Sequence, residues 1–450
     1  MNLDEGLRSR SLKLILSLVA LLVWAAPAQA SHPQDAFAET APDPTEFGPE
    51  LPRGASFDCV DGMAGPYPCD GVDLKGFVPL PALGSPTGND VWGWTDKKND
   101  REYAMVGTTI NTAFVDVTDA QNPVVVGYMP SEGIPDFVLW RDLKVDGHHA
   151  FVVSELTASG MQVFDLHRLR GADGDTPEVF QPDAVYDKIS NTHNIEINKR
   201  TDYAYAVGTN TCSKNGENGG LHMIDISAPE KPSFAGCARV DEVKKDEPNN
   251  YVHDAHCVLY HGPDEDYQGR ELCFGSNENT VAIYDVTNKS NPKVISTTTY
   301  PEAAYTHQGQ LSRNQRFFLF GDELDEQENG QPTTTYVLDA RDLDNPSTPK
   351  PYFHETASID HNLYVHKDLV YESNYTAGLR ILRYTNASLM KAKPKLREIG
   401  FFDVVPGVDI AEFAGTWSNF RFRGSGTVVV STIENEANGL FVLKPRARPR

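Results

Sequence analysis

Several residue patterns that mark common enzyme classes are absent from this sequence. There is no G-x-S-x-G elbow, no H-E-x-x-H zinc motif and no glycine loop of the kind that cradles phosphate. A serine or cysteine hydrolase is therefore not expected. Metal-assisted hydrolysis is the one type of enzymatic reaction for which the sequence offers candidate residues.

Positive charge is also scarce. The chain has 40 Lys and Arg residues against 63 Asp and Glu residues, and a formal net charge of −23. Because nucleic-acid phosphates would be repelled by this excess, a nucleic-acid partner is excluded. We interpret the acidic balance as a solvated surface, since it implies no particular acidic site.

Long apolar runs are limited to one stretch, Leu14 to Ala26, which follows three basic residues and precedes the small-x-small sequence Ala28-Gln29-Ala30. This arrangement predicts a signal peptide over 1–30 that is cleaved; an uncleaved anchor is the alternative. No second span is found, so no transmembrane anchor is expected after cleavage. The protein is predicted to be secreted, periplasmic or extracellular, with a flexible leader at 31–57 and a basic tail at 446–450.

Cysteine is rare, with six in 450 residues and no C-x-x-C pair. In an exported chain this number suits three disulfides better than a metal site. Proximity in the sequence favours the pairs Cys59–Cys69, Cys212–Cys237 and Cys257–Cys273.

A repeated pattern fills most of the chain. Seven short apolar runs end in Asp or in a residue at the same place, namely Asp116, Asp165, Asp225, Asp285, Asp339, Arg383 and Lys444. The intervals are 49, 60, 60, 54, 44 and 61 residues. Modules of this length bury their faces only by stacking on neighbours. We interpret the aspartates as turn formers that accept nearby backbone N–H groups.

Each repeat contains four predicted strands, which is typical of a β-propeller blade. The first strands are expected at 90–94, 140–145, 192–198, 253–260, 307–312, 360–365 and 417–422. The seventh repeat stops at its third strand, and a strand-like stretch at 71–83 precedes the first repeat. The sequence therefore predicts an all-β, seven-bladed β-propeller over 58–445, made of four-stranded antiparallel blades and closed by an N-terminal strand.

The start of each first strand carries the most informative residues, because the innermost strands line the channel of a propeller. At this position the repeats carry Trp92, Arg141, His193, His253, His307, His361 and Trp417. The residues that follow include Asp142, Asn194, Asp254, Gln308 and Asn362. We expect these side chains to meet at one channel mouth.

Three interpretations of this cluster compete. His193, His253, His307 and His361 could hold a divalent metal ion with amide partners around them. The mouth could instead grip a small anionic or sugar-like ligand. Alternatively, each histidine donates to the neighbouring blade and satisfies buried polar groups.

The ends of the second strands add further polar residues to the same region. These are Glu155, Asn277, Glu278, Asp322, Glu323, Asn374, Tyr375 and Glu434. Carboxylates near imidazoles would raise the histidine pKa values and make the mouth responsive to pH. The acidic run at 322–328 lacks the spacing of a helix-loop-helix calcium site, so we interpret it as a solvated turn.

The sequences of the repeats resemble those of a known family. NDVWGWTD, THNIEIN, HDAHCV, YTHQGQLS, DELDE, SIDHNLYV and GTWSNF, among other segments, are similar to the choice-of-anchor B family of exported bacterial proteins and its LVIVD-repeat class. The resemblance covers residues 58–445 and implies an extracytoplasmic propeller tethered by varied C-terminal devices. No sorting signal follows Leu443, so free secretion or periplasmic residence is expected, and the resemblance supplies no catalytic residues.

These observations predict a binding or interaction module that acts through the channel mouth, and they favour a binder over an enzyme. The expected partner is a small molecule, or an extracellular protein or glycan. A metal-dependent hydrolase that uses the same histidines, and a purely structural cell-envelope protein, are the alternatives.

Overall fold

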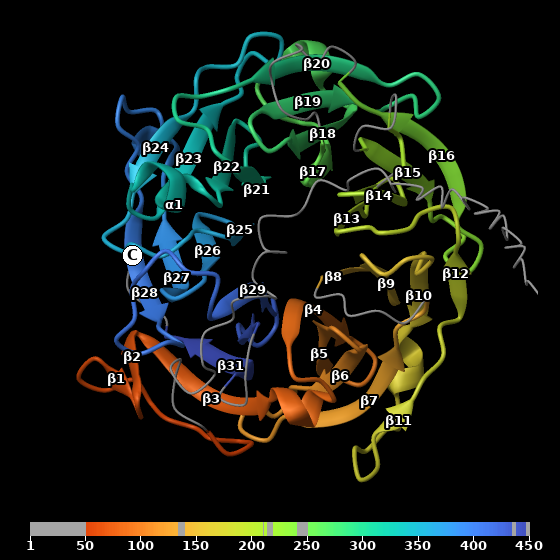
Figure 1. Ribbon diagram of the computed structural model, residues 1–450, viewed down its shortest axis with the longest axis vertical. Coiled ribbons are helices and arrows are strands. Elements are labelled where there is room, and N and C mark those ends of the chain that lie inside the picture. Colours follow the sequence, from red (N-terminus) through yellow and green to blue (C-terminus); the bar gives the residue numbers. More distant parts are fainter. Residues whose placement is uncertain are drawn as a thin grey trace, which may run out of the picture.

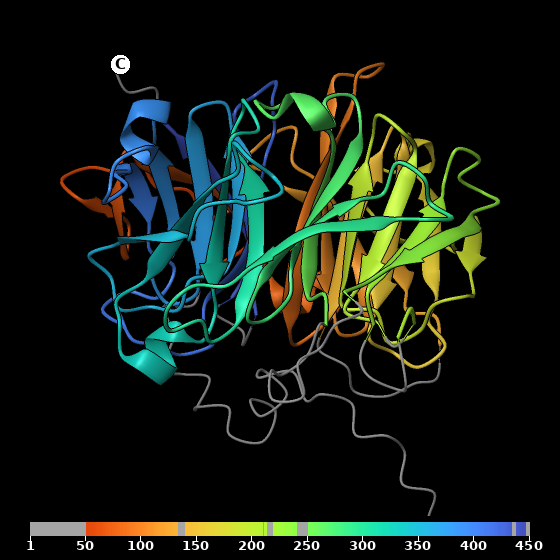
Figure 2. The same ribbon diagram turned by 90° about the horizontal axis from the view of Figure 1, so that it is seen from above.

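The computed structural model describes residues 51–133, 140–209, 211–213, 219–240, 251–433 and 438–446. These residues form a ring of seven sheets around a central axis, with the first strand of each repeat innermost (Figures 1 and 2). The predicted seven-bladed propeller is therefore confirmed. The predicted signal peptide, the first part of the leader and residues 447–450 lie outside the described residues.

The first four blades contain, from the axis outward, the following strands. Blade one has β4 (Gly88–Asp96), β5 (Arg101–Thr108), β6 (Asn111–Asp116) and β7 (Val124–Pro130), with β11 (Glu178–Val179) added in parallel. Blade two has β8 (Arg141–Asp146), β9 (His149–Ser154), β10 (Met161–Asp165) and β12 (Ala184–Tyr186). Blade three has β13 (Asn194–Asn198), β14 (Tyr203–Val207), β15 (Leu221–Asp225) and β16 (Ser233–Ala238). Blade four has β17 (Asp254–Leu259), β18 (Glu271–Ser276), β19 (Val281–Asp285) and β20 (Lys293–Thr298).

The last three blades follow the same order. Blade five has β21 (Thr306–Leu311), β22 (Phe317–Asp322), β23 (Thr334–Asp339) and β24 (Lys350–Phe353), with α1 (Asp325–Asn329) between β22 and β23. Blade six has β25 (Asn362–His366), β26 (Leu369–Asn374), β27 (Gly378–Arg383) and β28 (Arg397–Phe402), extended by β2 (Tyr67–Asp70) and β1 (Met63–Ala64). Blade seven has β29 (Thr416–Arg421), β30 (Val428–Thr432), β31 (Gly439–Pro445) and β3 (Val72–Pro79).

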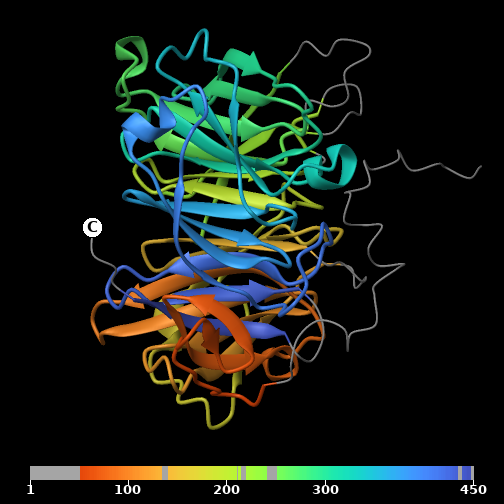
Figure 3. The same cartoon turned by 90° about the vertical axis from the view of Figure 1, so that its left-hand side faces the viewer.

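An N-terminal strand closes the ring, as predicted. β3 pairs antiparallel with β31, from Val72 opposite Pro445 to Pro79 opposite Gly439, so the chain start supplies the outer strand of the last blade (Figures 1 and 3). The pairing shifts register between Leu74 and Gly76. A Cβ at Gly76 would lie 2.2 Å from the carbonyl oxygen of Ala120, so this close approach requires glycine.

The last residues of the predicted leader contact β3. Phe57 donates its N–H to the carbonyl of Leu74 at 2.8 Å, and Gly54 donates to the carbonyl of Phe77 at 2.8 Å. At the other end of the chain, Arg446 of the predicted basic tail pairs with Asp73 at 2.6 Å. Both ends of the described chain are thus attached to β3.

All three predicted disulfides are present. Cys59–Cys69 bridges the segment before β3, Cys212–Cys237 ties the connection between β14 and β15 to β16, and Cys257–Cys273 joins directly opposed residues of β17 and β18. Three disulfides fit an oxidising, extracytoplasmic compartment. Among the described residues, no helix combines the length and apolar character that a membrane crossing needs.

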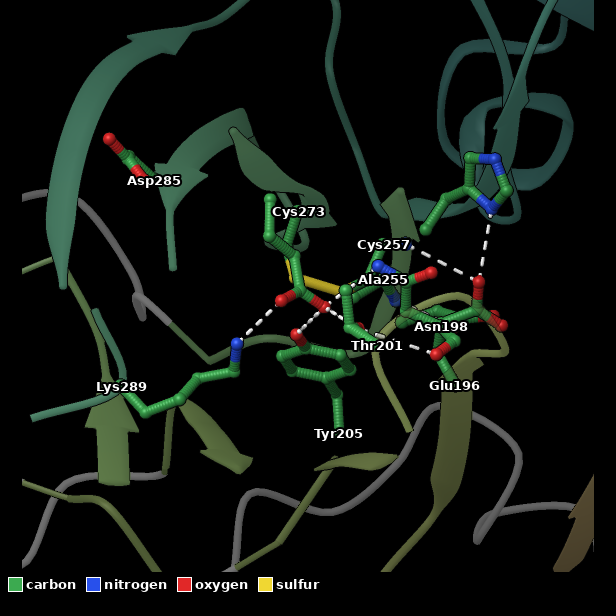
Figure 4. The surroundings of a disulfide bond; sticks show 12 residues. Glu196, Asn198, Thr201, Tyr205, Ala255, Cys257, Cys273, Asp285 and Lys289 are labelled. Atoms are coloured by element: carbon green, nitrogen blue, oxygen red, sulfur yellow. Dashed lines mark hydrogen bonds and ion pairs between the residues drawn. A yellow bond between two sulfur atoms is a disulfide. The ribbon is translucent and has the colours of Figure 1, made fainter. Parts of the chain in front are cut away.

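A buried carboxylate on β18, the strand that carries Cys273, shows how neighbouring blades are linked. Figure 4 shows the surroundings of the Cys257–Cys273 disulfide, with the partners of this carboxylate, Asn198, Thr201, Tyr205 and Lys289. Glu271 of blade four is 4% exposed and accepts hydrogen bonds from the side chains of Asn198, Thr201 and Tyr205 in blade three. Its other oxygen accepts from Lys289 at 2.6 Å. Polar groups between blades are therefore satisfied by partners from both blades.

Four of the five aspartates that end the third strands form turns, as predicted, whereas Asp339 pairs with Arg316 and Arg341. Asp116 accepts the N–H of Thr118, and Asp285 accepts the N–H of Thr287, each at 3.0 Å. Asp165 and Asp225 make the same contact two residues on. These residues maintain the fold and take no part in the site described below.

Candidate functional site

Six buried aromatic side chains form a closed loop around the propeller axis, at the end where the first strands begin. We call this the histidine end. The members are Trp140, His193, His253, His307, His361 and Trp417, and each is at most 5% exposed. In that order, and returning to Trp140, the ring centroids are separated by 6.3, 4.6, 4.4, 4.5, 4.3 and 4.6 Å. The predicted convergence of the four histidines is observed, but as a packed loop of rings that contact one another.

Two predicted members of this group lie elsewhere. Trp92 packs against Tyr364 and Phe420 farther along the axis, with ring centroids 5.5 and 5.1 Å away. The pairing of β4 with β5 shifts register between Gly88 and Val91. Trp92 is therefore not equivalent to the ring histidines, contrary to the alignment of the seven repeats.

Arg141 starts its strand as predicted, but its side chain turns toward blade one. It donates to the carbonyl of Thr108 at 3.0 Å and to the hydroxyl of Ser131. Burial lowers its pKa to about 10. The indole of the preceding residue, Trp140, closes the loop in its place, which the sequence alignment did not predict.

The polar residues that follow the ring positions link successive blades. Asp142 of blade two accepts the N–H of Ile195 in blade three at 2.7 Å, and Gln308 of blade five accepts the N–H of Leu363 in blade six at 2.9 Å. Asn194 donates to the carbonyl of His253 at 3.1 Å. Asp254 is the first residue of β17, and Asn362 is the first residue of β25. Blade packing therefore uses the groups that were candidates for ligand binding.

The ring histidines also contact neighbouring blades through Nδ1. His253 donates to the carbonyl of His307 at 3.1 Å, and His361 donates to the carbonyl of Trp417 at 2.6 Å. The Nδ1 atom of His193 lies 2.6 Å from Glu155. The interpretation in which histidines satisfy groups between blades thus fits His193, His253 and His361.

Burial sets the protonation of these histidines. It lowers the pKa of His253 well below its usual value and that of His361 to about 3. The expectation that nearby carboxylates raise these pKa values is therefore wrong for both residues, because desolvation of the charged imidazolium outweighs the attraction. At neutral pH both imidazoles are uncharged.

Two of the predicted metal ligands converge on a carboxylate that the sequence placed nearby. The Nε2 atoms of His307 and His361 lie 3.5 and 3.4 Å from the two oxygens of Glu323, which follows β22. These side chains are at most 2% exposed. The hydroxyl of Tyr375 donates to Glu323 at 2.7 Å and holds the carboxylate in place. Two imidazoles and one carboxylate are a donor set for a borderline divalent metal ion.

Most of the acidic run at 322–328 is buried, which corrects its interpretation as a solvated turn; only Gln327 and Glu328 at its end are exposed. Asp322 and Asp325 are 0% exposed and Glu326 is 4% exposed. Asp322 accepts from the hydroxyl of Tyr300 at 2.7 Å and from the N–H of Tyr305 at 2.5 Å. Asp325 and Glu326 are covered by the connection between blades five and six, where Asp360 lies beside them, and the sequence shows no such covering.

The second-strand residues are divided among several places. Glu155 reaches His193, Glu323 reaches His307 and His361, and Tyr375 reaches Glu323. Glu434 lies outside the described residues. Four histidines were predicted to share one metal ion. Of these, His307 and His361 have their Nε2 atoms next to the same carboxylate, that of Glu323.

Comparisons with known proteins identify no family for this chain. No family model and no curated protein matches the chain. Solved structures that it is similar to include the Cps50 (Swd1) β-propeller domain of Myceliophteria thermophila, at 10% identity with a TM-score of 0.49, covering 80% of this chain and 98% of that one. A protein from Lactobacillus plantarum matches at 12% identity with a TM-score of 0.44, covering 77% and 89%. The computationally designed Ika8 protein matches at 7% identity with a TM-score of 0.43, covering 79% and 83%.

Proposed function

We propose that this protein is an extracytoplasmic interaction module that binds a divalent transition metal ion between blades five and six, through His307, His361 and Glu323. One observation carries the proposal. Among the described residues the Nε2 atom of His361 has no hydrogen-bond donor, and it faces an oxygen of Glu323 at 3.4 Å.

Two acceptors that face each other require something between them. The Nδ1–H of His361 is used by the carbonyl of Trp417, so Nε2 presents a lone pair. That lone pair faces a carboxylate oxygen in a buried place, which is unfavourable unless a proton or a cation lies between the two atoms. A metal ion satisfies both groups, and the Trp417 carbonyl then fixes the metal-binding tautomer of the histidine.

The same geometry gives the ion a place in an interaction module. It would join the first strands of two blades to the loop after β22, at the histidine end of the propeller. Three protein ligands leave coordination positions for water or for an oxygen or nitrogen atom of a partner. Because the three ligands are at most 2% exposed, the partner that we propose is a small molecule that carries such a group, and an extracellular protein or glycan is the alternative. The disulfides and the resemblance to the choice-of-anchor B family support export.

Metal-dependent hydrolysis is the second candidate, because an open coordination position is also what a hydrolase needs. The burial of all three ligands counts against turnover of a bulky substrate, since each is at most 2% exposed. We therefore place binding ahead of catalysis.

The test compares two histidines of the aromatic loop, of which His361 is a proposed metal ligand and His253 is not. The full exported protein is stripped with a chelator, dialysed against Zn²⁺ or Mn²⁺, and its metal content is measured with that of His361→Gln, His253→Gln and Glu323→Gln. We expect one ion per chain in the wild type and in His253→Gln, and none in the other two variants. Equal loss in the two histidine variants, or no binding by folded wild type, would overturn the proposal. Metal-dependent cleavage of ester or phosphoester probes by loaded protein, lost in His361→Gln, would favour the hydrolase.

A further inference from the structure

Three more carboxylates converge beside the proposed metal ligands, and they come from two blades. Asp325 and Glu326 begin α1 after β22 of blade five, whereas Asp360 lies in the connection that leads into β25 of blade six. One oxygen from each side chain lies within 4.8 Å of the others. All three residues are at most 4% exposed.

These carboxylates have too few partners for their burial. Within the described chain, both oxygens of Asp360, Oδ1 of Asp325 and Oε2 of Glu326 accept no hydrogen bond. Their contacts include the hydroxyl of Tyr336 on Asp325 at 2.8 Å and the N–H of Asp360 on Glu326 at 3.3 Å. The side chains of Asp325 and Glu326 also contact each other, and the backbone of Asp322 contacts Asp360. None of the three forms an ion pair with Lys or Arg among the described residues. Burial raises the pKa of Asp325 to about 8 and that of Glu326 to about 12.

We propose that Asp325, Glu326 and Asp360 form a binding site for a hard divalent cation, best suited to Ca²⁺, that fastens blade five to blade six. Oxygen ligands alone favour a hard cation over zinc or copper. Ca²⁺ accepts irregular sets of carboxylates and completes its shell with water, whereas Mg²⁺ demands near-octahedral geometry. This site is separate from the imidazole-containing site of the proposed function and does not depend on it.

The backbone leaves room for this cluster. A Cβ at Gly321 would lie 1.9 Å from Oδ1 of Asp360. The carboxylate of Asp360 therefore fits against β22 only because this strand has a glycine at that position. The site also explains why no calcium motif is visible in the sequence. Asp325 and Glu326 are adjacent in the chain, but the third ligand comes from another blade. A bound cation would hold the loop after β22 against the blade connection, at the histidine end of the propeller.

Terbium luminescence tests the proposal, because Tb³⁺ replaces Ca²⁺ and is sensitised by a nearby tyrosine such as Tyr336. We expect the full-length wild-type protein to give sensitised emission that excess Ca²⁺ abolishes, and Asp360→Asn to weaken Tb³⁺ binding by about tenfold or more. The matched control is Asp344→Asn. It belongs to an exposed cluster with Asp264 and Asp342 that has the same spacing and has Tyr267 beside it. That variant should behave as wild type.

Thermal melting supplies the second measurement and shows that the variants fold. Ca²⁺ should raise the melting temperature of the wild type by several degrees over a chelator, and should leave that of Asp360→Asn unchanged. Tb³⁺ binding that is unaltered in Asp360→Asn, that is lost in Asp344→Asn, or that is absent from folded wild type would overturn the proposal. His361→Gln should keep the Tb³⁺ site, which separates failure of this inference from failure of the proposed function.

Discussion

Trp140 and Trp417 stack face to face, with their ring centroids 4.6 Å apart and their planes 11° from parallel. They belong to the starts of blades two and seven, so the stack spans the position of blade one, which contributes no ring to the loop. In blade one, β4 shifts register between Gly88 and Val91. The aromatic loop is closed by a contact between blades that are not neighbours in the ring.

Loss of this stack should destabilise the propeller. Trp417→Ala removes a side chain that is 5% exposed and contacts both Trp140 and His361. We expect the free energy of unfolding to fall by about 3–5 kcal/mol, and by less for Trp417→Phe. Urea unfolding followed by fluorescence measures this, and near-UV circular dichroism should lose the signal of the coupled indoles. Wild-type stability in Trp417→Ala would show that the stack is incidental.

Two buried aspartates beside Lys144 should respond differently to the same substitution. Burial, with the charge of Asp142 nearby, raises the pKa of Asp90 well above its usual value, so Asp90 is protonated. Burial alone would raise the pKa of Asp142, but Lys144 at 2.5 Å and the N–H of Ile195 lower it overall.

Asp90→Asn should therefore change the free energy of unfolding by less than about 1 kcal/mol, because an amide resembles a protonated carboxyl group. Asp142→Asn should cost about 3 kcal/mol, because it removes the charge that pairs with buried Lys144. Urea denaturation of the two variants side by side is the measurement. Equal losses of unfolding free energy in the two variants would contradict the assignment of the proton to Asp90.

A buried histidine of blade three should make the protein sensitive to acid. Burial lowers the pKa of His222 to about 4, and its ring nitrogens contact Tyr186 at 2.9 Å and Thr211 at 3.0 Å. The unfolded chain protonates this group near pH 6.5, whereas the folded state resists protonation down to about pH 4. The contribution to stability is therefore complete above pH 6.5 and is lost as the pH falls to 4, by about 3 kcal/mol in total.

Gln162 occupies the corresponding place in blade two, which makes His222→Gln a substitution that the fold already accepts. The variant should lose less stability than the wild type between pH 7 and pH 4.5. Urea unfolding at the two pH values measures the difference. Parallel losses in both proteins would mean that other groups carry the acid sensitivity.

The N-terminal strand should be needed for closure of the ring. Phe77 of β3 is fully buried and packs on Phe441 of β31 with ring centroids 4.9 Å apart. Phe77→Ala should cost about 3–5 kcal/mol. Phe234 lies on the outer strand of blade three but is 56% exposed, so Phe234→Ala should change stability by no more than about 0.5 kcal/mol. Thermal unfolding of the two variants tests the difference, and a similar tolerance of both would contradict closure through β3.

Much of the fold could be predicted because the repeat fixes it locally. Strand order, the turn aspartates, the closing strand and the disulfide pairs all follow from periodicity, turn chemistry and proximity in the sequence. The four ring histidines were predictable for the same reason, since a His followed by a polar residue recurs at one place in four repeats. These features depend on residues close together in the chain or equivalent between repeats.

The site itself depended on contacts that cross blade boundaries. Trp140 replaces Arg141 in the loop because the arginine finds polar partners in blade one. The acidic run after β22 looked solvated because nothing in its own sequence shows that Asp360, 34 residues from Glu326, packs beside it. Directions of side chains and burial of a polar segment are set by these distant partners, which single-repeat patterns do not contain.

Anomalous diffraction from crystals soaked in Zn²⁺ or Mn²⁺ tests the central claim most directly. The account predicts one anomalous peak between blades five and six, about 2.0–2.3 Å from Nε2 of His307, Nε2 of His361 and an oxygen of Glu323. A map without that peak, in which His361 and Glu323 approach to a direct hydrogen bond, would show that a shared proton holds these groups together and would contradict the claim.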